Sequence, residues 1–486
     1  MQIEFVCDLS GKPSSLKHFW EYCVGSDHAP MALRADWQKQ LQRCHAELGF
    51  ERVRFHGLLS DDLGTLVREK DEIVYSFFNA DQIFDFLIST DVHPFVELGF
   101  MPTALASGGK TVFHYHANVT PPRDYKQWAT LIRKLVSHWL DRYGIEEMEQ
   151  WNFEVWNEPN LNAFWTGTQK DYFKLYRYTA EAIKSVHSSL KVGGPATAKN
   201  EWIEEFREFC ERKKLPLDFI STHHYPTDAF GKPDDDTETQ LSKSRRGALR
   251  DEALDARRGA ADLPLYYTEW NSSSNPFDAL HDQPYAAAFV VKSVMDVAGV
   301  VDAYSFWTFS DIFEENYFSS IPFHGGFGLL TLHGIAKPAY RAFQLLHRLG
   351  MKQLLVDGLH ETANVWVVRD DDKLTVLMSN SALPGHSIKS ERVSMRLLNA
   401  PQPRAAWIER IDKDHANPRR VWREMGAPPY LSEDEVGRLV AASETVREQQ
   451  RFNYQDKVVS FEINLPPHSV AAIECEFAED LTREER

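Results

Sequence analysis

Short apolar runs alternate with longer amphipathic segments through the first two thirds of the chain. The runs are apolar along most of their length, as expected of strands that are buried on both faces of a sheet. They predict eight strands, at residues 21–25, 53–57, 93–99, 153–158, 191–195, 219–225, 265–270 and 303–309.

The segments between these runs carry apolar residues at three-to-four spacing, and several begin at Asp or Asn, the residues that cap helices. They predict helices at residues 35–48, 81–90, 124–143, 170–189, 200–213 and 284–298. A repeated strand–helix order predicts parallel strands joined by right-handed crossovers. Eight such units favour a closed α/β barrel, a (β/α)8 TIM barrel, which we place at residues 14–345.

The pattern changes near residue 350, after which predicted strands follow one another without helices between them. These strands are residues 365–368, 374–378, 393–397, 405–411, 458–463 and 470–477. They predict an accessory β-sandwich made of residues 1–13 and 346–486, which residues 2–7 join because the barrel is already complete. Residues 370–372 predict a hairpin turn, and Ser432 with Glu435 predicts a capped helix that runs towards Gln450.

Charge and composition restrict the function. The chain has 54 Lys and Arg against 71 Asp and Glu, a net charge of −17, which disfavours nucleic acid and anionic membranes as partners. It shows neither a signal-peptide pattern nor an apolar membrane span, which predicts a cytoplasmic protein, or an exported one whose signal was removed. Five scattered cysteines predict free thiols.

Polar residues gather at the last positions of the predicted strands, where a barrel opens into its active site. They include Arg54, His56, Glu97, Asn157, Glu158, His223, Tyr225, Glu269 and Trp307. The long polar segment 227–246 follows the sixth strand. It is either a lid or subsite wall over the barrel mouth, or a solvated insertion.

Two glutamates stand out among these residues. Glu158 lies in Asn157-Glu158-Pro159; such a motif can be a simple strand-to-turn junction, but it ends the fourth strand at the barrel mouth. Glu154, four residues earlier, is predicted to be structural. Glu269 ends the seventh strand after apolar and hydroxyl residues, where an unpaired carboxylate is costly, and an ion pair with Arg54 is the alternative explanation.

Strands four and seven face one another across an eight-stranded barrel, so the two carboxylates flank whatever the mouth holds. Glycoside hydrolysis uses such a pair, with one group protonating the leaving oxygen and the other attacking or activating water. Carboxyl groups about 5–5.5 Å apart give a covalent intermediate, and groups about 6.5–9.5 Å apart admit a water.

Several segments, spread nearly end to end, are similar to glycoside hydrolase family 39, whose members include β-xylosidases and α-L-iduronidases. The chain resembles the bacterial β-xylosidases more closely. The resemblance rests on residues 22–25 (YCVG), 56–59 (HGLL), 94–102 (PFVELGFMP), 118–122 (NVTPP), 156–161 (WNEPNL), 191–195 (KVGGP), 306–311 (FWTFSD) and 324–329 (HGGFGL).

The resemblance implies that Glu158 is the acid/base and Glu269 the nucleophile, and it favours the short separation. Because two like charges that close raise one pKa, we expect Glu158 to be the protonated partner. It also implies a sugar pocket formed by His56, Phe113, Asn157, Phe164, His223, Tyr225, Trp307 and Glu315. Two departures leave the roles of His224 and Trp270 open, since the family motif carries Ala and Tyr at these positions.

The predicted function is a retaining exo-glycosidase that removes terminal β-D-xylose from xylo-oligosaccharides. Alternatives are an α-L-arabinosidase, a β-galactosidase or an α-L-iduronidase on the same scaffold, or an inactive sugar-binding protein. No cofactor or metal is expected, because the pairs His114/His116 and His223/His224 complete no ligand set. The chain ends soon after its last strand, whereas tetrameric family members have a longer extension, so we expect a monomer.

Overall fold

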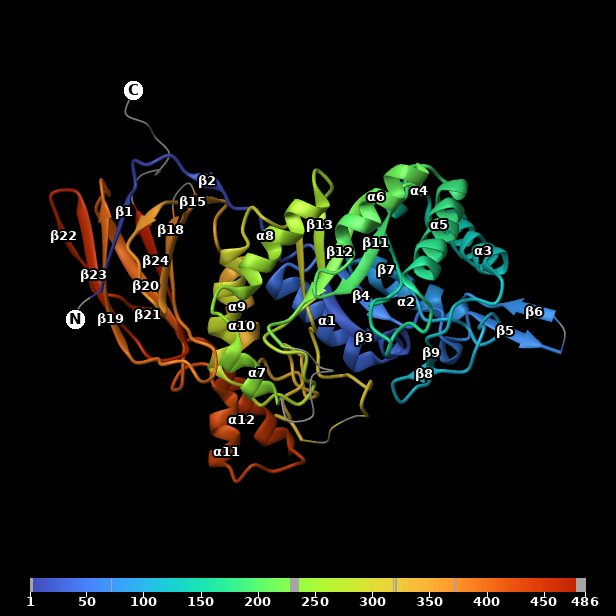
Figure 1. The fold of residues 1–486 in the computed structure, drawn as a ribbon. Coiled ribbons are helices and arrows are strands. Elements are labelled where there is room, and N and C mark those ends of the chain that lie inside the picture. The colour runs from blue at the N-terminus through green and yellow to red at the C-terminus, as the bar shows by residue number, and fades with distance from the viewer. Residues whose placement is uncertain are drawn as a thin grey trace.

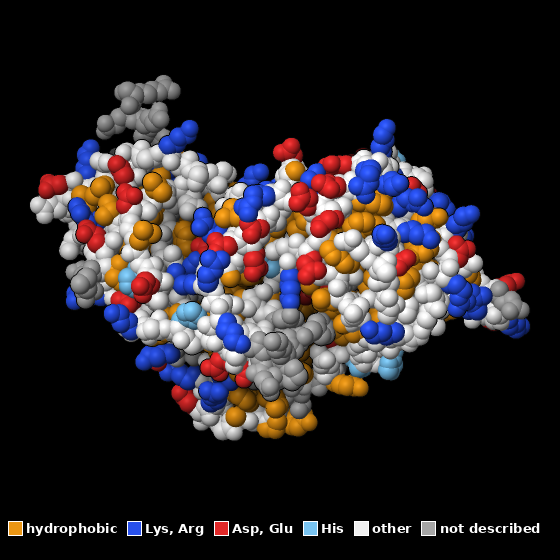
Figure 2. Space-filling view, in the orientation of Figure 1, with side chains coloured by type: hydrophobic (Ala, Val, Ile, Leu, Met, Phe, Trp, Pro, Cys, Tyr) orange, Lys and Arg blue, Asp and Glu red, His pale blue; other side chains and the backbone are white. Residues whose placement is uncertain are grey.

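The computed structural model describes residues 3–70, 72–227, 236–317, 319, 321–370 and 373–477. Figure 1 shows a barrel of strands surrounded by helices, with antiparallel sheets beside it formed mainly by the last part of the chain. Within the described residues, no helix combines the length and apolarity that crossing a membrane requires. On the face shown in Figure 2, acidic and basic side chains are interspersed.

Eight parallel strands close the barrel, which confirms the predicted TIM barrel. Each of them overlaps one of the eight apolar runs of the sequence. They pair in the order β10-β11-β12-β13-β14-β3-β4-β7. Their bounds are β3 (Val24–His28), β4 (Arg52–His56), β7 (His93–Leu98), β10 (Asn152–Val155), β11 (Lys191–Ala198), β12 (Phe219–His224), β13 (Leu265–Trp270) and β14 (Ala303–Phe306).

Helices cover the outside of the barrel, and all six predicted helices are present. Asp124 caps α3, and Thr168 with Asp171 forms a capping box at α5. The apolar pattern misses α8, whose buried face is built largely from alanines, and α10. The bounds are α1 (Ala35–Leu48), α2 (Phe78–Ser89), α3 (Tyr125–Tyr143), α5 (Gln169–Val186), α6 (Ile203–Lys213), α8 (Ala248–Ala260), α9 (Pro284–Asp296) and α10 (Pro338–His347).

The chain also forms small elements between these units. They are the short helices η1 (Ala29–Leu33), η2 (Asp61–Leu63), α4 (Ile145–Met148) and α7 (Thr237–Lys243), and the short strands β5 (Leu66–Glu69), β6 (Glu72–Tyr75), β8 (Thr111–Val112) and β9 (Ala117–Asn118).

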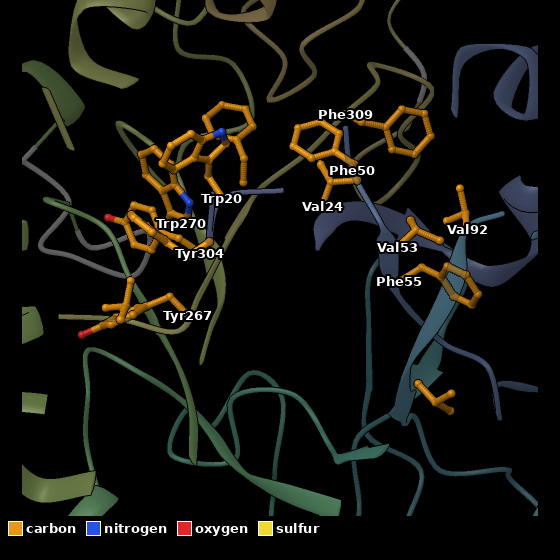
Figure 3. Close-up of a cluster of buried hydrophobic side chains, with 14 of the residues drawn as sticks. Trp20, Val24, Phe50, Val53, Phe55, Val92, Tyr267, Trp270, Tyr304 and Phe309 are labelled. Atoms are coloured by element: carbon orange, nitrogen blue, oxygen red, sulfur yellow. The ribbon is translucent and has the colours of Figure 1, made fainter. Parts of the chain in front are cut away.

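Aromatic side chains fill much of the core between the strands and the outer helices (Figure 3). Trp270 belongs to this core. It stacks on Tyr304 with ring centroids 4.1 Å apart and is fully buried. His224 lies nearby and hydrogen-bonds to the Tyr304 hydroxyl at 2.7 Å. Both residues whose roles the sequence leaves open are therefore packing residues that face away from the barrel mouth.

The antiparallel part consists of two sheets that enclose a separate hydrophobic core. Their strand orders are β2-β15-β17-β18-β24-β20-β21 and β16-β1-β19-β23-β22. The bounds are β1 (Ile3–Asp8), β2 (Ser14–Ser15), β15 (Lys352–Leu354), β16 (Val356–Asp357), β17 (Ala363–Arg369), β18 (Lys373–Asn380), β19 (Glu391–Leu398), β20 (Pro403–Ile411), β21 (Glu448–Gln449), β22 (Asn453–Gln455), β23 (Val458–Leu465) and β24 (Ser469–Phe477).

The N-terminal strand joins these sheets, as the sequence predicts. β1 pairs in parallel with β19, with Ile3 opposite Val393. Ser14 and Ser15 pair with β15 and so extend the first segment slightly beyond residue 13. The division into residues 14–345 and residues 1–13 with 346–486 stays a prediction, and residues 371–372 of the predicted hairpin turn lie outside the described residues.

The predicted helical insertion contains two helices, α11 (Pro418–Glu424) and α12 (Glu433–Ser443), rather than one. Ser432 and Glu435 form the predicted capping box. The helix ends at Ser443 and not near Gln450, because Glu448 and Gln449 pair with β20 as a strand. The two helices pack through Trp422 and Leu439 against residues from the loop that follows β14, namely Phe323 and Ile335.

The segment after the sixth barrel strand connects the barrel to the sandwich. Residues 228–235, and with them two of the three aspartates of 234–236, lie outside the described residues. Asp236 caps the helix α7. Arg246 then donates hydrogen bonds to the carbonyl oxygens of Thr362 at 2.7 Å and Ser381 at 2.8 Å, both in the antiparallel part. The described end of the segment is thus anchored on the sandwich.

Candidate active site

A cavity of about 360 Å³ opens at the carboxyl ends of the barrel strands. This volume lies within the usual range for small-molecule sites. Nine of the ten residues predicted for the site line it: His56, Phe113, Asn157, Glu158, Phe164, Tyr225, Glu269, Trp307 and Glu315. The tenth, His223, is fully buried and does not line the cavity.

The backbone at Glu158 is held in an unusual conformation. Trp156 and Glu158 have φ values of 71° and 44°, a left-handed region that side chains other than glycine adopt rarely. The Glu158 N–H donates to the Ala196 carbonyl at 2.8 Å, and the Glu158 carbonyl accepts from Leu161 at 3.0 Å. Such strain persists where neighbouring structure holds it and is common at functional sites.

The two glutamates lie close together. One carboxylate oxygen of Glu158 and one of Glu269 are within 4.8 Å of each other, and both side chains are largely buried. This separation falls on the short side of the two geometries that glycoside hydrolysis uses. The Tyr225 hydroxyl donates to Oε1 of Glu269 at 2.6 Å, and Nη1 of Arg54 lies 3.5 Å from its Oε2.

Arg54, on β4, organises the floor of the cavity from below. This fully buried guanidinium donates to Glu154 at 2.6 Å and lies 2.9 Å from Glu97. It also donates to Oδ1 of Asn157 at 2.9 Å, which leaves the Asn157 amide nitrogen available to the cavity. Glu154 is structural, as predicted. Glu269 also lies close to Arg54. It therefore both pairs with Arg54, as the alternative explanation held, and lines the cavity.

Burial raises the pKa of Glu269, and the charge of Glu158 adds to this effect, while Arg54 opposes it. This direction is not the one expected for the ionised partner of the pair. Because the Glu158 charge is one of its causes, a proton on Glu158 removes that part and favours an ionised Glu269. The protonation state of Glu269 therefore depends on the charge of Glu158. Burial also keeps the pKa of Tyr225 well above its ordinary value, so its phenol carries the proton it donates.

His56, on the same strand as Arg54, belongs to a second group of polar residues. Nδ1 of His56 is 2.6 Å from Glu97, and its Nε2 is 3.5 Å from Glu315. Burial would raise the pKa of Glu97, but His56 and Arg54 outweigh it and hold it below its ordinary value. Burial, together with several nearby carboxylates, raises the pKa of Glu315 well above its ordinary value. A protonated Glu315 can donate as well as accept hydrogen bonds from sugar hydroxyls.

Aromatic rings form the remaining walls. Phe113 and Phe164 lie with centroids 5.6 Å apart, and the Trp307 indole lies 4.8 Å from the His56 ring. Gly25 allows this position, because a Cβ there would come within 2.5 Å of the Trp307 ring. Flat apolar faces of this kind suit the faces of a sugar ring.

His223 contacts the two carboxylates instead of the cavity. Its Nδ1 lies 3.0 Å from Oε1 of Glu158 and 3.6 Å from Oε2 of Glu269. The pairing of β12 with β13 shifts register between Thr222 and His223, a local irregularity that no residue pattern signals. The sequence predicts that His223 contacts the sugar, whereas in the structure its ring lies behind the two glutamates and does not line the cavity.

Apart from Thr227, the first residue of the segment 227–246, sequence reasoning does not single out the residues around the cavity entrance. The cavity is also lined by Val112, Leu161, Ala198, Lys199, Thr227, Ser274, Pro276, Asn316 and Phe327. Most come from loops, and the available signal was adjacency: Val112, Leu161 and Asn316 lie within three positions of predicted residues. The Thr227 and Ser274 hydroxyls are 3.1 Å apart, which joins two loops at the entrance.

Three groups within the described residues bring His and carboxylate atoms within 4.8 Å of one another: His18 with Glu21 and His347, Asp27 with His28 and Glu314, and Glu158 with His223 and Glu269. The shortest nitrogen–oxygen contact in each group is 2.7–3.0 Å, a hydrogen-bonding distance. His114 lies 3.9 Å from Glu314. The expectation that the site needs no metal or cofactor stays a prediction.

Comparison with known proteins agrees with this architecture. The family model of glycosyl hydrolases family 39 matches residues 3–458. A β-xylosidase from Caldicellulosiruptor saccharolyticus is 47% identical over 94% of this chain and 95% of its own, and one from Geobacillus stearothermophilus is 38% identical over 96% and 94%. The crystal structure of a monomeric β-xylosidase from Caulobacter crescentus CB15 superposes with a TM-score of 0.84 at 31% identity, covering 98% of this chain and 100% of that one. The chain belongs to glycosyl hydrolases family 39 and is an enzyme of that glycoside hydrolase family.

Proposed function

We propose that this enzyme is a retaining, exo-acting β-xylosidase that releases terminal β-D-xylose from xylo-oligosaccharides. The observation that carries the proposal is the short separation of Glu158 and Glu269, within 4.8 Å, in one cavity. Two relatives at 47% and 38% identity are β-xylosidases, which supports xylose as the sugar. The cavity is of a size that suits a terminal sugar rather than a long chain.

In the first step, Glu269 attacks the anomeric carbon as the bond to the leaving oxygen breaks. Glu158 transfers its proton to that oxygen, so the leaving group departs as a neutral alcohol. Tyr225 donates to the attacking carboxylate from 2.6 Å and favours its ionised form. The Asn157 amide nitrogen is placed to donate to a sugar hydroxyl, a contact that strengthens in the transition state.

In the second step, Glu158 is ionised and takes a proton from an incoming water. The water oxygen bonds to the anomeric carbon while the ester bond to Glu269 breaks, which regenerates both carboxyl groups. Two inversions at the same carbon give net retention. Glu158 thus changes from acid to base, and Glu269 from nucleophile to leaving group, without any external acid or base.

One residue at the entrance, Lys199, supports a uronate as the second candidate substrate. Lys199 lines the cavity, and a cation is what an α-L-iduronidase would require for the substrate carboxylate. Among the other lining residues, the aromatic rings, hydroxyls, amides and carboxyl groups suit a neutral pentose better. As to assembly, we propose a monomer, in line with the monomeric β-xylosidase whose structure matches along its full length.

Two measurements test the reaction class and the sugar. A panel of nitrophenyl glycosides should give the highest kcat/KM with the β-D-xyloside; higher values with the α-L-arabinoside, β-galactoside or α-L-iduronide would replace the sugar assignment. Mass spectrometry after reaction with a 2-deoxy-2-fluoro-xyloside should find the label on Glu269. A label elsewhere, or product released with inverted anomeric configuration, would contradict the double displacement.

A further inference from the structure

His223 stands in a continuous chain of hydrogen bonds beneath the cavity. Its Nδ1 lies 3.0 Å from Oε1 of Glu158, and its Nε2 lies 3.1 Å from the Thr268 hydroxyl. Thr268 in turn donates to Oε1 of Glu154 at 2.7 Å. All the side chains in this hydrogen-bond network are buried, and the reaction proposed above does not use Thr268.

The donors in this chain can be assigned by counting hydrogens. Glu154 is paired with the Arg54 guanidinium at 2.6 Å, so its carboxylate can only accept. The one hydroxyl hydrogen of Thr268 therefore points to Glu154. The Thr268 oxygen is then left to accept, and the partner at 3.1 Å that can donate is Nε2–H of His223.

The imidazole is neutral in this position. Burial lowers the pKa of His223 to about 4, with Arg54 and His56 acting in the same direction against the carboxylates of Glu269 and Glu154. A neutral ring with its hydrogen on Nε2 presents a bare lone pair at Nδ1. That lone pair faces Glu158, and a hydrogen bond across 3.0 Å then requires the hydrogen to come from Glu158.

We propose that Glu154 and Thr268 fix the tautomer of His223, and that His223 thereby holds the catalytic proton on Glu158. His223 and Thr268 are then positioning residues, since they act through Glu158 and not on the sugar. The inference rests on the proposed role of Glu158 as acid/base.

The arrangement serves both steps of the reaction. Before the first step, the Nδ1 lone pair stabilises the protonated form of Glu158, because a hydrogen bond made only by the neutral acid raises its proton affinity. After proton transfer, an ionised Glu158 faces that lone pair without a hydrogen between them. This repulsion favours recovery of a proton from the incoming water.

The test is the pH dependence of kcat/KM, whose basic limb reports the acid of the free enzyme. Thr268→Val keeps the shape and removes the hydroxyl, so His223 is free to place its hydrogen on Nδ1 and stabilise ionised Glu158. We expect the basic limb to move to lower pH by about one unit. Thr268→Ser should restore the wild-type limb, because it restores the hydroxyl.

A matched control lies on the neighbouring strand. Thr222 is also buried, and its hydroxyl donates to the Thr197 carbonyl at 2.9 Å, outside the chain of bonds. Thr222→Val should leave the basic limb in place. The decrease in kcat/KM caused by Thr268→Val should also be larger for xylobiose than for a dinitrophenyl xyloside, because the dinitrophenolate leaving group needs little protonation. A limb that moves equally in both valine variants, or not at all, would overturn the inference.

A direct reading of the tautomer covers the case in which Thr268→Val does not fold. With 15N-labelled histidine, the wild-type signal that disappears in His223→Asn should show a protonated Nε2 and a bare Nδ1. A protonated Nδ1 would refute the proposal. A Glu158→Ala variant distinguishes failure of the acid/base assignment from failure of the role of His223. If Glu158→Ala keeps full turnover of substrates with poor leaving groups, the acid/base assignment fails. If Glu158→Ala loses this turnover but the basic limb of Thr268→Val does not move, only the role of His223 is overturned.

Discussion

The floor and the entrance of the cavity are built on different principles. The floor residues lie at strand ends, are buried, and are fixed by Arg54, Tyr225 and neighbouring carboxylates. The entrance residues, such as Thr227, Ser274 and Asn316, come from loops outside the barrel strands. Parallel strands force the first set together, whereas loops vary freely. We therefore expect chemistry to depend on the floor and discrimination among leaving groups on the entrance.

The largest effect should come from the proposed nucleophile on the floor. Glu269→Gly should lower kcat on a nitrophenyl β-xyloside by roughly 10⁴-fold or more, since a removed nucleophile leaves only binding and polarisation. Added azide should restore turnover and give the α-configured xylosyl azide. Steady-state kinetics and product analysis measure both. Glu205→Gly, at an exposed position on α6, is the control, and similar activity in the two variants would refute the assignment.

Removal of the cation under the floor should mainly affect stability. Arg54→Met leaves Glu97 and Glu154 buried without their partner, which should lower the free energy of unfolding by about 3–5 kcal/mol. Denaturant unfolding measures this. Arg43→Met removes a partly exposed ion pair with Glu47 and should cost about 1 kcal/mol or less. Equal losses in the two variants would show that the floor does not depend on Arg54.

His28 connects the floor to the loop that carries Glu315. Its ring contacts Asp62 at 2.8 Å and Glu314 at 3.0 Å. Burial alone would lower the pKa of His28, but hydrogen bonds to Asp27 and Asp62 outweigh it and raise the pKa to about 9.

A raised pKa means that the folded state binds the proton more tightly than the unfolded state. The resulting stability is complete below about pH 6.5 and is lost as the pH rises through about 9. The loss should be roughly 3 kcal/mol in the wild type and absent in His28→Gln. Unfolding curves between these pH values measure it, and equal slopes for both proteins would contradict the assignment.

Loss of a single hydrogen bond on the floor should have a smaller effect. Tyr225→Phe removes the donor 2.6 Å from Glu269 and should lower kcat/KM by about 10–100-fold, as expected for a hydrogen bond to a charged group. Tyr125→Phe, whose hydroxyl only reaches a backbone carbonyl at 3.4 Å on the outer surface, is the comparison. Kinetics on the same substrate should separate the two variants clearly; no difference would place Tyr225 outside the reaction.

The smallest effect should be at the entrance. Asn316→Ala should change KM for xylobiose and longer oligosaccharides by less than about tenfold, because it removes one solvent-accessible contact. A monosaccharide aryl xyloside should respond less. If both substrates lose activity to the extent seen for Tyr225→Phe, the division between floor and entrance is wrong.

The floor residues can be predicted from the sequence because the order of the strands in a barrel fixes where their last residues lie. Eight apolar runs predict eight strands, and their polar last residues must meet at one mouth. Glu158 and Glu269 follow from that argument, and the resemblance adds Phe113, Phe164 and Glu315 on loops. The place of His223 depends on a register shift in one strand pair, which no spacing rule contains.

Other differences have similar physical origins. The helix α12 ends at Ser443 because the following polar residues find a strand partner in β20, a long-range contact invisible in local pattern. The entrance residue Lys199 belongs to no periodic pattern and lies near the cavity only through the path of its loop. The direction of the Glu269 pKa depends on the depth of burial and on a neighbour across the barrel, and neither is a property of the motif.

The parallel pairing of β1 with β19 has a consequence for synthesis on the ribosome. Ile3 lies opposite Val393, so β1 emerges 390 residues ahead of its partner. At about 5–20 residues per second, the strand waits roughly 20–80 s with its edges unpaired while the whole barrel is made. The sandwich can close only after its last strands, β23 and β24, have been made. An exposed β-edge of this duration invites pairing with other nascent chains, so the yield of folded enzyme should depend on elongation rate and chaperone supply more than its barrel alone would require.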